Sequence, residues 1–177
     1  MAYLITKTDI KTYRPTAELD DARINPFIIE AQNMDLRPVL NDVLFYDFIT
    51  KFNVTLDPMY AKYQKLLNGG TYTYNSQTIY FDGVKAMLSY YALARFVVAN
   101  PVNVTRMGVA IKTLQQSEPA DAATIKYFVN DLRGTAIGYQ NQIIQFLITN
   151  PTDYPLYNLG GGASQQPNKT SFKFFKL

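Results

Sequence analysis

"DGVKAMLSYYALARFVVANP", residues 82–101, predicts a long buried helix and thereby decides the fold class. Asp82 and Gly83 are typical of a helix start, and Asn100 followed by Pro101 is typical of a helix end. Apolar residues recur between them at the spacing of one helical face. The predicted buried residues are Val84, Met87, Leu88, Tyr91 and Val98.

Helical periodicity continues on both sides of this segment. We expect a helix that starts at Asn25–Pro26, a short turn around Pro38, and helices over about 41–52 and 58–68. The longest helix is expected over about 121–150. Gly134 and Gly138 lie inside it, and because each weakens a helix by about 1 kcal/mol relative to alanine, we expect them to allow close approach of another helix.

Thr and Tyr alternate around Asn75–Ser76, which predicts a small β-hairpin over 71–81. The connection over 101–120 is long for a compact domain and has no predicted element. The expected fold is all-α, a bundle of about five helices with one hairpin and extended N- and C-terminal arms. We place the N-terminal arm at 1–16, the helical domain at 17–158 and a Gly-tethered C-terminal arm at 159–177.

The composition favours a protein that assembles through contact surfaces. Only 18% of the 177 residues are charged, whereas there are 14 tyrosines and 11 phenylalanines. Histidine and cysteine are both absent, which removes the commonest general base, thiolate nucleophiles and the commonest metal ligands. We therefore expect no enzyme activity, no catalytic residues, no cofactor and no metal. No apolar run reaches membrane-spanning length, so no membrane partner is expected.

The acidic residues have a structural interpretation. Asp42, Asp57, Asp82 and Asp121 stand at or near predicted helix starts, where an anion stabilises the helix dipole. Asp20–Asp21 lacks the oxygen-rich spacing of a calcium loop and is expected to begin a helix.

Arg95 lies on the apolar line of the central helix and must be paired if it is buried. The favoured interpretation is an internal ion pair with a carboxylate such as Glu30, or a side chain whose charged end reaches the rim. The alternative is an ion pair between subunits.

The C-terminus "GGGASQQPNKTSFKFFKL", residues 160–177, combines a flexible tether with an apolar end. Phe172, Phe174, Phe175 and Leu177 are predicted to contact a neighbouring protein, either as an added strand or by inserting their side chains. A disordered tail that is aromatic by coincidence is the alternative. Tyr3 and Tyr13 of the N-terminal arm are further candidate partner contacts.

Basic and aromatic residues mix on the predicted arms and loops. Such mixtures can neutralise phosphates and stack bases. The residues concerned are Lys7, Lys11, Arg14, Lys62, Lys65, Arg106, Lys169, Lys173 and Lys176. A non-sequence-specific DNA-binding accessory protein is therefore the rival function.

Five stretches resemble a known protein family: "LFYDFI", "YAKYQKLLNGGTYTY", "YFDGVKAMLSYYALARFV", "VTRMGVAIK" and "GYQNQIIQFLITNPTDYPLY". In this order and spacing, over 45–157, they resemble the small helical head–tail connector proteins (adaptor or ring proteins) of tailed bacteriophages, especially crAss-like phages. The tail after Gly160 lies outside the resemblance.

The resemblance implies a structural virion protein with no catalytic motif. Such proteins form a ring, usually of twelve copies, beneath the portal protein, where they extend the DNA channel and dock the next ring or tail protein. A cyclic homo-oligomer needs two different surfaces on each subunit. Arg106 and Lys112, on the long connection, are candidates to face the channel and contact genomic DNA non-specifically. The expected location is the virion head–tail junction, after assembly in the host cytoplasm.

Overall fold

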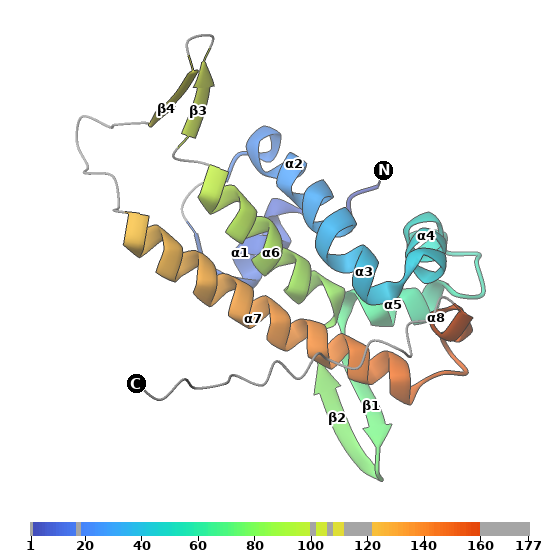
Figure 1. The fold of residues 1–177 in the computed structure, drawn as a ribbon. Helices are drawn as coiled ribbons and strands as arrows, with labels where there is room; N and C mark the ends of the chain where they lie inside the picture. Colours follow the sequence, from blue (N-terminus) through green and yellow to red (C-terminus); the bar gives the residue numbers. More distant parts are fainter. Residues whose placement is uncertain (1, 17–18, 100–101, 106–107, 112–121, 160–177) are drawn as a thin grey trace, which may run out of the picture.

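A computed structural model describes residues 2–16, 19–99, 102–105, 108–111 and 122–159 (Figure 1). Its elements, in chain order, are α1 (Lys7–Tyr13), α2 (Asp21–Ala31), the π-helical segment η1 (Gln32–Leu36), α3 (Arg37–Leu40), α4 (Asp42–Lys51), α5 (Tyr60–Asn68), β1 (Gly70–Tyr74), β2 (Gln77–Phe81), α6 (Gly83–Ala99), β3 (Val102–Thr105), β4 (Gly108–Ile111), α7 (Ala122–Thr149) and α8 (Pro155–Leu159).

Helix α6 is the centre of the fold. It runs between α2 and α7, and α1 packs against it as well (Figure 1). Val84, Met87 and Leu88 are fully buried as predicted. Tyr91 is half-buried, and the prediction for Val98 is wrong because 50% of its surface is exposed near the end of the helix. Packing on several sides buries more of α6 than one stripe, including Ala86, Ala92 and Ala94.

The predicted hairpin is present and projects from the bundle beside the C-terminal half of α7 (Figure 1). Asn75 and Ser76 form its turn with φ of 49° and 64°, the positive values that a two-residue hairpin turn requires. Its base is anchored by aromatic contacts. The Phe81 ring stacks on Phe146 of α7 with centroids 4.1 Å apart, and Tyr72 packs edge-on against both rings.

Helix α2 begins earlier than predicted. Asp20 caps it by accepting a hydrogen bond from the Ala22 backbone N–H at 3.1 Å, so the expected start at Asn25–Pro26 is wrong and Pro26 lies inside the helix. The expectation that Asp20–Asp21 begins a helix is confirmed. Asp20 is the capping residue of α2, whereas Asn25 and Pro26, which have the pattern of a helix start, lie within the helix.

The N-terminal segment is not an extended arm. Residues 7–13 form α1, which Thr6 and Asp9 cap reciprocally. Leu4, Ile5 and Ile10 are all at most 3% exposed. The error arose because the β-branched residues here are buried against the bundle, so tertiary packing overrides their local β preference.

The prediction of a mainly helical fold with a small antiparallel hairpin is confirmed. A bundle of about five helices is not confirmed, because several described helices are short and α2, η1 and α3 follow one another directly. β3 and β4 form a second antiparallel pair inside the connection 101–120, where no element was predicted. The C-terminal arm lies outside the described residues.

Candidate functional site

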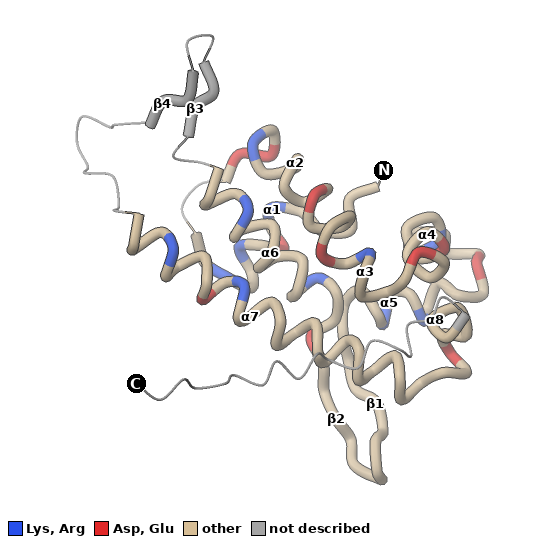
Figure 2. Tube along the Cα trace, viewed as in Figure 1, with Lys and Arg blue, Asp and Glu red and all other residues tan. Residues whose placement is uncertain are grey.

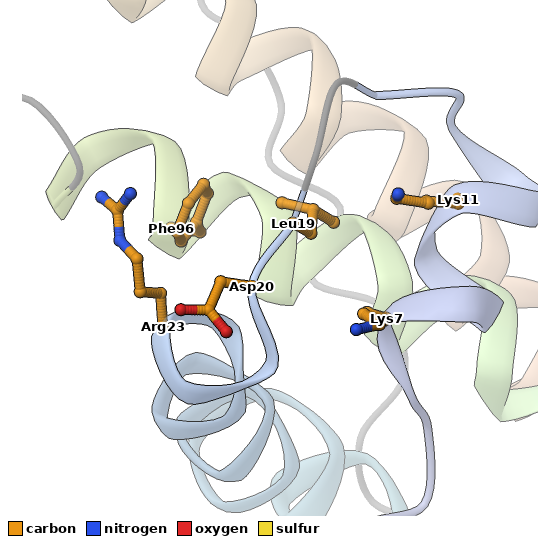
Figure 3. Close-up of a pocket in the computed structure, with 6 residues that line it drawn as sticks. All are labelled: Lys7, Lys11, Leu19, Asp20, Arg23 and Phe96. Carbon is orange, nitrogen blue, oxygen red and sulfur yellow. The ribbon is translucent and has the colours of Figure 1, made fainter.

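A surface pocket of about 500 Å³ lies where α1, α2 and α6 meet (Figure 3). Basic side chains dominate its lining, together with one carboxylate and two apolar groups. The lining residues are Lys7, Lys11, Leu19, Asp20, Arg23 and Phe96.

Three of the four charged groups of this pocket, Lys7, Asp20 and Arg23, already have structural roles. Lys7 Nζ lies 2.6 Å from Asp21 Oδ2, and this hydrogen bond raises the pKa of Lys7. The Arg23 guanidinium lies over the Phe96 ring, 5.6 Å from its centroid, and Asp20 caps α2. The pocket therefore offers an anion little uncompensated charge and brings together no nucleophile and base.

The aspartates near the starts of α4 and α5 also have structural roles. Asn41 caps α4 through its side chain, and Asp42 beside it pairs with Arg37. Asp57 Oδ1 accepts a bond from the Met59 backbone N–H at 2.7 Å, just before α5. Among the described residues, no group of three or more acidic side chains could hold a metal ion. Asp121 is outside them.

Tyr63 donates a short hydrogen bond to the Asp47 carboxylate. Burial, and then this bond, raise the pKa of Tyr63 far above that of a free tyrosine. The neutral phenol therefore links α5 to α4.

Arg95 forms the internal clamp that was favoured for it. Its guanidinium donates to both Asp35 carboxylate oxygens, at 2.9 and 3.0 Å, and lies 3.6 Å from Glu30. Glu30 was expected, whereas Asp35 was missed, because η1 brings Asp35 against α6 only in the tertiary structure. The ion pair joins η1 to α6 within one chain, so the alternative of an inter-subunit pair is not needed.

The two predicted N-terminal partner contacts differ. Tyr3 is 48% exposed. Tyr13 is half-buried against the core, and its carbonyl accepts a hydrogen bond from the Tyr90 hydroxyl at 3.1 Å. The candidates Arg106, Lys112, Phe172, Phe174, Phe175 and Leu177 lie outside the described residues.

Most of the described basic residues proposed to contact DNA already contact a carboxylate or an aromatic ring. Arg14 lies 3.7 Å from Asp131, Lys62 lies 3.0 Å from Asp153, and the Lys65 ammonium lies over the Phe146 ring. Lys11 has no ion-pair partner among the residues that the structure describes. Exposed pairs such as these are weak, but they reduce the unpaired positive charge that these candidate residues offer to DNA.

One side of α7 exposes a row of uncharged residues, with the exposed Asp131 at its edge in the N-terminal half of the helix. Tyr127, Ile137 and Ile148 are 78%, 48% and 52% exposed. Gly134, Gly138 and Asn141 are also exposed and lie on the same side, since all are spaced by about three, four or seven residues. We call these six residues the α7 outer face.

We expected Gly134 and Gly138 to allow close approach of another helix, and among the described residues this prediction is wrong. A methyl group added at Gly134 or Gly138 would meet no neighbouring group within 4 Å, so none of the described helices approaches them. The apolar pattern of α7 was visible in the sequence, but the direction in which its glycines point depends on which side α6 covers.

The hairpin is the second uncharged surface. No charged residue occurs between Gly70 and Phe81, or in α7 from Gly134 onward, and Figure 2 shows both segments without charge. Tyr74 and Tyr80 are 40% and 62% exposed. No helix among the described residues has the length and apolarity to cross a membrane.

These features define a mainly helical protein with a partly buried ion-pair clamp at Arg95 and uncharged exposed surfaces on α7 and the hairpin. The chain belongs to a family of unknown function, DUF6712, which matches residues 36–166. The match includes the hairpin, the Arg95 side of the clamp and the whole of α7. No curated protein and no solved structure matches the chain.

Proposed function

We propose that this protein is a structural connector that forms a ring at the head–tail junction of a tailed bacteriophage virion. The ring, of about twelve copies, lies beneath the portal protein, extends the DNA channel and docks the next ring or tail protein. The sequence resemblance over residues 45–157 supplies this specific assignment, and the described surfaces support it.

The observation that carries the proposal is the uncharged α7 outer face. Its large apolar side chains, Tyr127, Ile137 and Ile148, are exposed to water and take no part in the core. Such surfaces mark sites of protein contact. The hairpin, with exposed Tyr74 and Tyr80, provides a different contact surface, and a closed ring needs two different surfaces on each subunit.

The pairing of the cations supports a structural role over the rival DNA-binding role. Four described basic residues of the predicted DNA contacts, Lys7, Arg14, Lys62 and Lys65, already contact a carboxylate or an aromatic ring. Passing DNA in a channel requires only loose contacts, for which Arg106 and Lys112 remain candidates.

Native mass spectrometry of the full chain over a range of concentrations tests the proposal. We expect a closed oligomer of about a dozen copies, and we expect Ile148→Lys to shift it toward monomer because it places a charge on the contact surface. Ala22→Lys, at an exposed position on α2, is the matched control.

A strict monomer at every concentration, and also in the presence of purified portal protein, would contradict the connector function. If that monomer bound DNA with a steep dependence on salt, the rival function would be favoured instead.

A further inference from the structure

We propose that the α7 outer face is the docking site for the apolar C-terminal segment, residues 172–177, of an adjacent copy of the chain. The choice of an adjacent copy rests on the proposed ring, whereas the choice of surface rests on the observations below.

No contact within the described part of the chain requires either of the two glycines of this face. Each destabilises a helix interior by about 1 kcal/mol relative to alanine. Neither has a positive φ, and the space over each is open to 4 Å. Gly83, by contrast, is required by backbone contacts within the chain. The open space over Gly134 and Gly138 therefore suits a group from outside the bundle that approaches the helix backbone.

The surroundings of the glycines define what this group is. Ile137 lies between them and Ile148 follows on the same side, both about half exposed. The exposed Asn141 lies on the same face, and the exposed Asp131 and Gln142 lie at its edge. A helix surface with small residues at its centre and apolar residues beside them fits aromatic and aliphatic side chains. From Gly134 onward it offers no charge to bind an ionic ligand.

The C-terminal segment has this chemistry. Phe172, Phe174, Phe175 and Leu177 are its apolar groups, while Lys173 and Lys176 would remain in water beside an uncharged surface. No other part of the chain outside the described residues is comparably rich in aromatic residues.

The length of the tether also fits. The chain leaves the body at α8, which is fixed beside the C-terminal end of α7: Tyr154 packs on Phe146 with centroids 5.3 Å apart, and Asn41 Nδ2 donates to the Tyr157 carbonyl at 2.7 Å. Residues 160–171 can span at most about 40 Å when extended. This matches the length of α7, whose 28 residues rise about 42 Å, so the segment can reach an α7 beyond its own bundle.

Site-directed crosslinking of the full chain tests the inference, because the natural sequence has no cysteine. One copy carries Ile137→Cys on α7 and a second carries Lys173→Cys, which keeps every apolar group of the segment. After mixing and mild oxidation, we expect disulfide-linked heterodimers to form several-fold faster than with Ala22→Cys in place of Ile137→Cys. Ala22 is exposed on α2, away from α7.

A second variant separates docking from folding. Gly138→Leu places a bulky side chain over α7, at a position where an added Cβ has open space around it. We expect the melting temperature to be unchanged or raised, and the crosslinking between Ile137→Cys and Lys173→Cys to be lost.

Three results would overturn the inference. The first two are equal crosslinking to Ala22→Cys and crosslinking that survives Gly138→Leu. The third comes from a chain that carries both Ile137→Cys and Lys173→Cys: if it forms only intrachain disulfides, the occupant is the chain's own segment. Native mass spectrometry of the same samples separates this failure from failure of the proposed function. A closed oligomer without α7 crosslinks keeps the connector and removes only the docking site, whereas a monomer removes the connector.

Discussion

Gly83 begins α6 with a φ of 73°, and a methyl group there would lie 2.3 Å from the Gly69 backbone nitrogen. Gly69 has a φ of 83° and ends α5 by donating its N–H to the Lys65 carbonyl at 2.9 Å. The end of α5 and the start of α6 therefore touch backbone to backbone at the base of the hairpin. Only glycine allows this approach. The glycines of α7 have neither constraint.

Alanine at these positions should have opposite effects. We expect Gly83→Ala to lower the free energy of unfolding by more than about 2 kcal/mol, since both the φ and the close contact are incompatible with a Cβ. We expect Gly138→Ala to raise it by up to about 1 kcal/mol through helix propensity. Urea denaturation monitored by circular dichroism measures both. A loss of stability in Gly138→Ala would show that the helix surface is not open.

Arg95 should contribute to stability and not to assembly. Arg95→Met leaves the largely buried Asp35 without its two hydrogen bonds, and we expect a loss of about 1–3 kcal/mol, while the surviving folded protein assembles normally. Arg37→Met breaks a pair with an exposed carboxylate, Asp42, and should lower stability much less than Arg95→Met. If Arg95→Met instead keeps its stability but fails to assemble, the clamp acts between subunits.

At the scale of elements, a buried amide joins the N-terminal segment to the bundle. Gln32, in η1, is fully buried; its Oε1 accepts a hydrogen bond from the Leu4 N–H at 2.8 Å, and its Nε2 donates to the Ala2 carbonyl at 3.0 Å. These bonds, with the buried Ile5 and Ile10, hold residues 2–13 against α2 and α6. A segment that resembles an arm in sequence is thus part of the core.

Gln32→Leu tests this attachment. It leaves the buried Leu4 N–H unpaired, and we expect a loss of about 1–3 kcal/mol together with faster hydrogen exchange in residues 2–13. Asn33→Ala, which removes only a bond to the Ile29 carbonyl within the helical segment, is the control and should not change exchange in residues 2–13. Unchanged exchange in Gln32→Leu would mean that Leu4 and Ile5 alone hold the segment.

At the scale of the whole molecule, the absence of histidine and the number of buried tyrosines predict an unusual pH profile. Burial raises the pKa of several phenols above the ordinary value of 10.0, namely Tyr13, Tyr63, Tyr91, Tyr154 and Tyr157. A raised pKa means that the unfolded state loses these protons first. Their contribution to stability is therefore present below pH 10 and is lost as the pH rises toward the folded pKa.

We expect the free energy of unfolding to be roughly constant from pH 5 to 8, where no side chain of ordinary pKa titrates, and to fall above about pH 10. It should also fall in acid. Burial raises the pKa of Asp9, but bonds from Lys85 and Thr6 outweigh this and lower it below 3.8, so its contribution is lost as the pH falls through that lower value. Chemical denaturation at each pH measures the profile, and Tyr154→Phe should reduce the alkaline slope. A titration between pH 6 and 7 would contradict the prediction.

Much of the fold could be predicted because local signals agreed with tertiary packing. The periodic apolar residues of α6 and α7, and the turn at Asn75–Ser76, place two helices and the hairpin correctly. The errors lie where local and tertiary preferences differ. Pro26 is inside α2, residues 7–13 are helical, and β3 and β4 interrupt a connection that showed no pattern.

For the candidate site, the sequence indicated that Arg95 must be paired and that the glycines of α7 leave room for a neighbour. It could not show that Asp35 is the main partner, because that contact joins residues 60 positions apart. Nor could it show that the glycines face outward. Periodicity defines the faces of a helix but not which face a neighbouring helix covers.

By itself, then, the sequence determined the helical class, the hairpin, the lack of histidine and cysteine chemistry, and a surface with few charges and many tyrosines and phenylalanines. These properties depend on composition and on neighbours a few residues apart. Only the tertiary structure decided that the N-terminal segment belongs to the core, that Arg95 closes on Asp35, and that the α7 outer face is left open. These depend on contacts between distant residues, where burial and pairing outweigh local preference.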